Sequence, residues 1–202
     1  MRRLLLVLLM VVLPAGASLA APRTILVLGD SLSAAFGFEL RHGWVAQLEQ
    51  RLARDRLDYT VVNASVSGDT TANGLARLPA LLQRHRPGIV IVELGGNDGL
   101  RGLPPEQIKH NIVAIVKEAK VAGAKVVLVG VPLPPNYGRQ YIERFRRLYG
   151  EIAAEQNVAL VPSIVDGVAG DRVLMQPDGI HPTAQAQPRM LENVWAKLRG
   201  LL

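Results

Sequence analysis

Short apolar runs alternate with amphipathic segments along most of this 202-residue chain. Five runs are rich in Val, Ile and Leu without period-two alternation, which is typical of strands covered on both faces: 25–28, 59–63, 89–94, 126–131 and 159–161. Between the runs, apolar residues recur at helical spacing, as at Ile108, Ile112 and Ile115. This alternation predicts an α/β fold, with a five-stranded, parallel, doubly wound sheet as the middle of a three-layer α/β/α sandwich.

The first 20 residues have the composition of an export signal. Arg2 and Arg3 precede an apolar stretch, 4–13, and the small residues Ser18 and Ala20 follow it. The apolar stretch is about half as long as a membrane span, so we expect a signal peptide, 1–20, that is cleaved after Ala20. The hydrophobic content of 49% suits a single periplasmic domain over the remaining residues, 21–202.

Cysteine content limits the covalent links that the chain can form, and its charge limits the kinds of molecule that it is expected to bind. The chain has no cysteine, so neither a disulfide nor a lipid-modified N-terminal cysteine is available to it. Without Arg2 and Arg3, the net charge of +6 falls to +4, from 21 basic and 17 acidic residues. The basic residues are spread along helices and only nine residues are aromatic, which argues against a nucleic-acid partner. Transient contact with an anionic membrane surface stays an open alternative.

Four short polar motifs stand where strands or connections are expected to end. Gly-Asp-Ser-Leu-Ser occupies 29–33, Ser-Gly-Asp 67–69, Gly-Gly-Asn-Asp 95–98 and Asp-Gly-Ile-His-Pro 178–182. The carboxyl ends of parallel strands meet at one edge of a sheet, where ligands bind near the switch in strand order. The first three motifs are therefore expected together, and the sequence predicts a site at that edge.

Ser31 and His181 are the predicted nucleophile and general base. Ser31 directly follows a buried strand, in a turn able to expose its hydroxyl, although a helix N-cap is its alternative role. The turn is not the Gly-x-Ser-x-Gly elbow of the α/β-hydrolases, because position 33 is serine. Asp178 precedes His181 by three residues, so one loop presents both, and turn capping is the alternative role of Asp178. The other histidines lie in or beside polar helical segments and are expected at the surface: His42, His85 and His110.

Three groups are predicted to form an oxyanion hole. Gly68 offers a backbone N–H without an obstructing side chain, Asn97 offers an amide N–H, and Ser31 offers its own N–H. Each of the first two also has a simpler explanation as a turn residue. Considered together with Ser31 and His181, they favour acyl transfer, in which negative charge develops on a carbonyl oxygen.

These motifs resemble those of the SGNH (GDSL) hydrolase family, which is named after its Ser, Gly, Asn and His. Gly-Asp-Ser-Leu near the predicted mature N-terminus, Gly68, Gly-Gly-Asn-Asp and Asp178-x-x-His181 carry the resemblance. Longer stretches are similar to the branch of bacterial periplasmic thioesterases, lysophospholipases and arylesterases: 61–65, 74–82, 92–102, 133–134 with 136–138, and 178–182. The likeness extends through essentially the whole of 21–202, and none of the five functional positions departs from the family pattern.

The resemblance implies a flavodoxin-like sandwich that hydrolyses thioesters and esters of fatty acyl groups. It implies Ser31 as nucleophile, His181 as base and Asp178 as its orienting carboxylate, with Ser31 N–H, Gly68 and Asn97 as the oxyanion hole. It implies no metal and no organic cofactor. A monomer that acts on an acyl ester, a thioester or a lysophospholipid is the expectation, and export favours a lysophospholipid over acyl-CoA.

Two Pro- and Gly-containing connections, 99–105 and 132–138, are expected at the same edge of the sheet. Ordinary rigid connections are the simpler reading of both. The alternative is that they form the rims of a substrate groove. Their apolar residues are then the candidates for an acyl-binding wall: Leu100, Leu103, Leu133 and Tyr137.

Three other functions stay open as alternatives. A metal-dependent phosphatase would use the acidic residues of the same edge, but the chain lacks an Asp-x-Asp pair after the first strand. A nucleotide-binding module would need a Gly-rich phosphate loop, and neither Gly-x-Gly-x-x-Gly nor a Walker sequence occurs. An acetyl- or acyl-esterase of envelope polysaccharide would share the catalytic residues and differ only in the groove.

Overall fold

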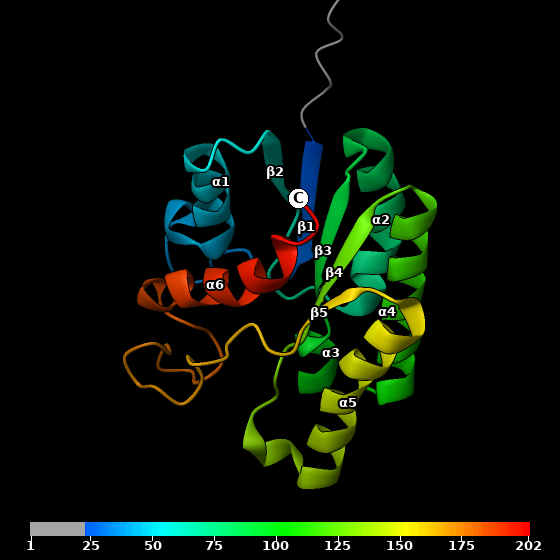
Figure 1. Ribbon diagram of the computed structural model, residues 1–202. Coiled ribbons are helices and arrows are strands. Elements are labelled where there is room, and N and C mark those ends of the chain that lie inside the picture. Colours follow the sequence, from blue (N-terminus) through cyan, green and yellow to red (C-terminus); the bar gives the residue numbers. More distant parts are fainter. Residues whose placement is uncertain (1–22) are drawn as a thin grey trace, which may run out of the picture.

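The computed structural model describes residues 23–202, so the predicted signal segment, 1–20, lies outside the described residues. Its centre is a parallel sheet with the strand order β2-β1-β3-β4-β5 (Figure 1). This order is that of flavodoxin-like, doubly wound folds, and it confirms the predicted sheet. The strands are Arg23–Gly29 (β1), Tyr59–Asn63 (β2), Ile89–Glu93 (β3), Lys125–Val129 (β4) and Ala159–Val161 (β5).

Helices cover both faces of the sheet, with α1 and α6 on one face and α2, α4 and α5 on the other (Figure 1). Successive residues of β1 alternate between the two cores, since Val27 packs on the first side and Leu26 and Leu28 on the second. The run is apolar because both of its faces are buried. The helices are Trp44–Arg54 (α1), Thr71–His85 (α2), Gly96–Leu100 (α3), Pro105–Val121 (α4), Arg139–Gln156 (α5) and Gln187–Leu198 (α6), with 3₁₀ turns at Leu40–His42, Pro135–Tyr137 and Ala184–Ala186.

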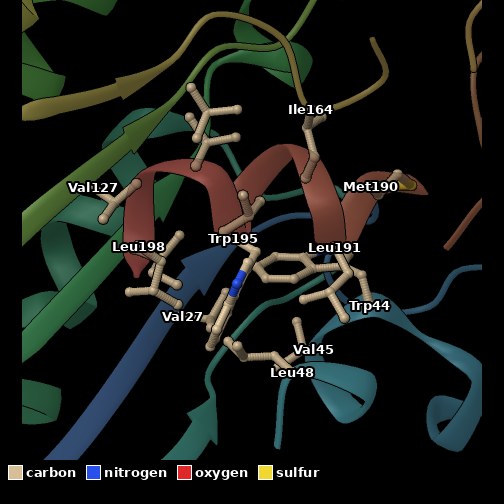
Figure 2. Packing of buried hydrophobic residues seen from close by; sticks show 14 of the residues in the cluster. Val27, Trp44, Val45, Leu48, Val127, Ile164, Met190, Leu191, Trp195 and Leu198 are labelled. Carbon is tan, nitrogen blue, oxygen red and sulfur yellow. The ribbon is translucent and has the colours of Figure 1, made fainter. Parts of the chain in front are cut away.

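Large side chains fill the space between the sheet and the helices α1 and α6. Figure 2 shows Leu191 and Trp195 of α6 near Val45 and Leu48 of α1, in the same cluster as Val27 of β1. Leu48 and Val27 are fully buried. Burial of one side chain of this size contributes about 1.5–3 kcal/mol. This packing anchors α6, and with it the end of the connection that carries His181.

One predicted strand is less buried than its sequence suggested. In β2, Thr60 and Asn63 are exposed and the other three residues are only partly buried. The strand lies at the edge of the sheet and pairs only with β1. The apolar run therefore indicated a strand correctly, but the expectation that both of its faces are covered was wrong for β2.

Helix α2 contains a proline and nevertheless runs from Thr71 to His85. It begins well before Pro79, although a proline inside an apolar helical pattern favours a kink or a late start of the helix. The Thr70 hydroxyl accepts the Asn73 N–H at 3.3 Å and caps the first turn. The start of this helix matters for the site, because the Gly68 segment leads directly into it.

The strand order opens a crevice at the carboxyl edge of the sheet. Since β1 lies between β2 and β3, the connections that leave β1 and β3 turn to opposite faces. Ser31 follows β1 and Asn97 follows β3, so the two residues flank this switch point. Within residues 23–202, every helix is too short or too polar to cross a membrane.

Candidate active site

The turn that carries Ser31 is fixed by close packing. Gly29 ends β1, and a Cβ at this position would lie 2.8 Å from side-chain atoms of both Ser33 and Ser65. Only glycine lets these segments approach so closely. The Ser33 N–H donates to the Asp30 carbonyl at 3.2 Å, which closes the turn. Ser31 is left half-buried, and it lines a cavity at this edge of the sheet.

Asp178 and His181 lie at the tip of a hairpin-like loop. Met175 and Pro182 form an isolated antiparallel bridge at its base. At the tip, Asp178 Oδ1 accepts the backbone N–H groups of Ile180 and His181, both at 2.9 Å. The carboxylate therefore caps the turn through one oxygen and leaves the other free for the imidazole.

The side chains of Asp178, His181 and Ser31 form a continuous hydrogen-bonded chain. Asp178 Oδ2 lies 2.7 Å from His181 Nδ1, and His181 Nε2 lies 2.9 Å from Ser31 Oγ. With a proton on Nδ1, the imidazole donates to Asp178 while Nε2 accepts the Ser31 hydroxyl. The structure thus brings together side chains that are 150 residues apart in the sequence.

Asp178 stays ionised at neutral pH. Burial by itself would raise the pKa of this carboxyl, but hydrogen bonds from the His181 N–H, the His181 imidazole and the Ile180 N–H lower the pKa to about 2. An ionised carboxylate only accepts hydrogen bonds, so it selects the imidazole tautomer that carries its proton on Nδ1. Nε2 is then left as a base directed at Ser31.

Gln176 joins the loop of His181 to the loop of Ser31. Its Nε2 donates to the carbonyls of Phe36 and Pro182, at 2.8 and 3.0 Å. The Phe36 ring in turn packs beside the His181 imidazole, with ring centroids 4.2 Å apart. Our sequence analysis missed both residues. Neither belongs to a spaced motif, and their contacts cross 140 residues of sequence.

Asn97 lies in the first turn of α3, and two acceptors hold its amide. Nδ2 donates to the Asp69 carbonyl at 2.9 Å and to Asp30 Oδ2 at 3.1 Å. Gly68, which precedes Asp69, has a φ of 85°, a left-handed conformation that favours glycine. Within the described part of the chain, the N–H groups of Gly68 and Ser31 have no acceptor, so both remain available as donors.

Asp98 fixes the start of α2 relative to α3. This carboxylate is fully buried. Its Oδ2 accepts the Thr71 N–H at 2.8 Å and its Oδ1 accepts the Thr71 hydroxyl at 2.5 Å. Asn111 Nδ2 donates to the same hydroxyl oxygen at 2.9 Å. Because Thr71 follows the Gly68 segment closely, this network also holds Gly68 near Asn97.

An apolar cavity of about 350 Å³ opens beside Ser31. Of the four predicted groove residues, Leu100 and Leu133 line it. Leu103 instead packs against the core under α4 and α5, and Tyr137 donates from its hydroxyl to the Leu100 carbonyl at 2.9 Å. The opposite wall comes from the long connection after β5, which sequence reasoning did not identify as part of the groove: Val165, Ala169, Gly170 and Met175.

The acidic residues of this edge are occupied by protein partners. Asp69 forms an ion pair with Arg77 at 2.7 Å, and Asp98 binds Thr71. Among residues 23–202, no group of three or more His, Asp or Glu side chains is arranged to hold a metal ion. His42 and His110 are exposed and His85 is half-buried, outside the cavity.

A hydrogen-bonded Asp, His and Ser at the carboxyl edge of a flavodoxin-like sheet are the arrangement of a serine hydrolase. Residues 27–188 match the GDSL-like Lipase/Acylhydrolase family. The chain belongs to this family, as the resemblance of its motifs predicted.

Known relatives cover almost the entire chain. It is 57% identical over 183 residues to the esterase TesA of Pseudomonas aeruginosa, with 91% of each chain covered. It is 44% identical, also over 183 residues, to the thioesterase 1/protease 1/lysophospholipase L1 of Escherichia coli K12, with 91% of this chain and 86% of the relative covered.

Solved structures are similar over the same region. A crystal structure of TesA, 57% identical, matches with a TM-score of 0.87 over 89% of this chain and 100% of that one. The psychrotrophic esterase EstA of Pseudoalteromonas sp., solved with monoethylphosphonate as inhibitor, is 38% identical. It matches with a TM-score of 0.84 over 88% of this chain and 97% of that one.

Proposed function

We propose that the protein hydrolyses carboxylic esters and thioesters of acyl groups through an acyl-enzyme intermediate on Ser31. The observation that carries this proposal is the hydrogen-bonded chain from Asp178 through His181 to Ser31, beside an apolar cavity. Membership of a family whose relatives include an esterase, an arylesterase and a thioesterase supports the same reaction.

In the first half of the reaction, Ser31 is acylated. Its hydroxyl proton passes to His181 Nε2 while Oγ forms a bond to the acyl carbonyl carbon. The resulting tetrahedral intermediate then loses the alcohol or thiol, which receives the proton from His181. Asp178 stabilises the transient imidazolium and keeps its ring in place, because it stays ionised and hydrogen-bonded to Nδ1.

In the second half, water takes the place of the leaving group. A water molecule gives a proton to His181 and its oxygen attacks the carbonyl carbon of the acyl-enzyme. Collapse of the second tetrahedral intermediate breaks the bond to Ser31 Oγ, which recovers the proton from His181. One water is consumed, and one carboxylic acid and one alcohol or thiol are formed.

The Ser31 N–H, the Gly68 N–H and the Asn97 amide stabilise the oxyanion in both halves. The free N–H groups of Ser31 and Gly68 support this assignment. Both hydrogens of the Asn97 amide have acceptors in the structure, Asp30 Oδ2 and the Asp69 carbonyl, so the amide donates to the oxyanion when one of these hydrogens turns toward it. The N–H groups of Ser31 and Gly68 are free before the reaction, so these two donors stabilise the developing charge with little reorganisation.

The substrate is a lipid acyl ester, for which a lysophospholipid is our choice. The cavity beside Ser31 is lined by aliphatic side chains and prolines, which suit an alkyl chain better than a sugar. The signal-like segment, 1–20, supports export to the periplasm as a single mature domain, 21–202, in a compartment where membrane lipids are available. We propose that the mature protein acts as a monomer.

A graded substrate panel tests this function. Mature protein is assayed with p-nitrophenyl esters of increasing acyl length, with lysophospholipids, and with acetylated polysaccharide, and Ser31→Ala measures the background. We expect turnover to rise with chain length until the cavity is filled, and lysophospholipid to be cleaved. Activity confined to acetyl groups on polysaccharide would overturn the proposed substrate.

Covalent labelling tests the mechanism separately. An alkyl phosphonate ester is expected to modify Ser31 alone, as identified by peptide mass spectrometry, with loss of activity in proportion to labelling. A label on Ser33 or Ser67 would contradict the assignment of the nucleophile.

A further inference from the structure

Two buried carboxyl groups lie beneath the Ser31 turn, and the hydrolytic steps above use neither. Asp30 is 2% exposed, and Glu93, the last residue of β3, is 0% exposed. Glu93 stands opposite Gly29 in the register of β1 and β3, directly beside the turn. A charged residue in the apolar run 89–94 is the only signal of this site in the sequence.

The hydrogen bonds of Glu93 leave one of its oxygens without a partner. Oε2 accepts the Ser33 hydroxyl at 2.7 Å and the Asp30 N–H at 3.4 Å. Oε1 is buried and has no hydrogen-bond partner within residues 23–202. A buried acceptor without a donor costs about 1–3 kcal/mol and more when the group is charged, so this environment disfavours the ionised form of Glu93.

Asp30 connects this carboxyl pair to Asn97. Its Oδ1 accepts the Leu32 N–H at 3.1 Å, and its Oδ2 accepts an amide hydrogen from Asn97 Nδ2 at 3.1 Å. No Lys, Arg or His of the described residues forms an ion pair with either carboxyl group within 4.0 Å. Two adjacent buried carboxylates without a cation repel each other strongly, so one of them stays protonated.

The surroundings decide which group keeps the proton. Burial raises the pKa of Glu93 well above its ordinary value, and the negative charge of Asp30 raises it further. Burial also raises the pKa of Asp30, to about 6, against the lowering effects of the Leu32 N–H, the charge of His181 and the Asn97 amide. Other charged or titratable groups lie near the pair. The Tyr149 hydroxyl donates to the Leu94 carbonyl, Asp98 binds Thr71, and Arg77 pairs with Asp69 and donates to the Gly29 carbonyl at 3.4 Å.

We propose that Glu93 holds one proton as a neutral acid, and that the ionised Asp30 beside it positions the Asn97 amide for the oxyanion. Asp30 acts through Asn97 and Glu93 acts through Asp30, so both are positioning residues. A neutral Glu93 also removes one negative charge from the surroundings of the oxyanion. The remaining charge on Asp30 attracts the His181 imidazolium that forms during the reaction. This inference rests on the proposed role of Asn97.

Infrared spectroscopy tests the protonation state without any assay of activity. At pH 7, the protein is expected to show the carbonyl stretch of a protonated carboxylic acid, and Glu93→Gln is expected to lack it. The control is Glu49→Gln, which makes the same chemical change at an exposed position and is expected to keep the band. Absence of the band from the unchanged protein would overturn the proposal.

Thermal unfolding gives an independent measurement. A carboxyl group whose pKa is raised by folding stabilises the protein below its ordinary pKa and loses that contribution as the pH rises. Glu93→Gln cannot ionise, so the variant does not lose this stability as the pH rises. The Tm of the variant minus the Tm of the unchanged protein is therefore expected to be larger at pH 8 than at pH 5. An equal difference at both pH values would contradict a neutral Glu93.

Kinetics tests the positioning role. Asp30→Asn is expected to lower kcat by about tenfold to a hundredfold with KM nearly unchanged, because a misplaced donor matters only in the transition state. Glu93→Gln keeps a neutral side chain and is expected to retain kcat within about threefold. An unchanged kcat in Asp30→Asn, with a large loss in Asn97→Ala, would overturn the positioning role and leave the proposed function intact. No loss in Asn97→Ala would instead refute the oxyanion hole.

Discussion

The proposed base side of the site, Asp178 and His181, and its proposed oxyanion side, Gly68 and Asn97, are held by different kinds of contact. Asp178 and His181 are three residues apart, their bonds to each other lie within one turn, and the Asp178 side chain remains 40% exposed. Asn97 instead depends on Asp30 and Asp69, which are 67 and 28 residues away. The Asp98 carboxylate beside it is fully buried.

The difference has consequences for mutations. In a local, partly exposed pair, water can replace a hydrogen-bond partner that a mutation removes. Changes on the base side are therefore expected to affect the reaction more than the fold. A buried network leaves unpaired polar groups when one member is lost, each of which costs about 1–3 kcal/mol. Changes on the oxyanion side are therefore expected to lower both rate and stability.

The largest effect on kcat is expected at Ser31, which belongs to both sides of the site. Ser31→Ala removes the nucleophile, and kcat is expected to fall by at least about 10⁴-fold with an unchanged Tm. Steady-state kinetics with a p-nitrophenyl ester measures it. Ser65→Ala is the control, because this nearby hydroxyl is buried without a hydrogen-bond partner among the described residues. A similar loss in Ser65→Ala would remove the special role of Ser31.

Asn97→Ala tests the oxyanion side alone. Loss of one oxyanion donor is expected to lower kcat by about 10²–10³-fold with little change in KM. Asn193→Ala is a matched control, since this amide donates to the carbonyls of Ile164 and Asp166, away from Ser31. If kcat of Asn97→Ala fell only a few-fold, Asn97 would be a structural residue of α3.

Asp98→Asn tests whether the buried network carries stability. The amide replaces a charged acceptor of two Thr71 bonds, so the free energy of unfolding is expected to fall by about 2–3 kcal/mol. Chemical denaturation measures this change, and Asp58→Asn at an exposed position is the control. Equal stability of the two variants would contradict the proposed difference between the two sides.

The smallest effect is expected from the ionisation of Asp178. Folding lowers the pKa of this carboxyl to about 2, so its stabilising contribution is present above its ordinary pKa of 3.8 and is lost as the pH falls through 2. Because the side chain is 40% exposed, the contribution is about 1 kcal/mol or less. Asp178→Asn is expected to lower Tm slightly at pH 6 and not at pH 2. A deficit that persists at pH 2 would assign the effect to lost packing.

Much of the fold was predictable because it depends on local pattern. Apolar runs without alternation gave five parallel strands, and only the exposure of β2 was misjudged, since burial depends on which strand ends at the edge of the sheet. Asp178 and His181 were predictable for the same reason, because residues three apart in a short loop can meet. The turn that carries Ser31 was predictable from its position after a buried strand.

What the sequence alone determined was the five strands and the motifs that follow them, which place Ser31, Asn97 and their neighbours at one edge of the sheet, because strands and the residues after them follow from patterns of a few residues. The tertiary structure decided which distant groups support them. Gln176 joins two loops across 140 residues, the connection after β5 forms the second cavity wall, and Glu93 lies against Asp30 across two strands. Such contacts form when elements pack against each other. The number of residues between two elements does not tell how far apart they lie in space.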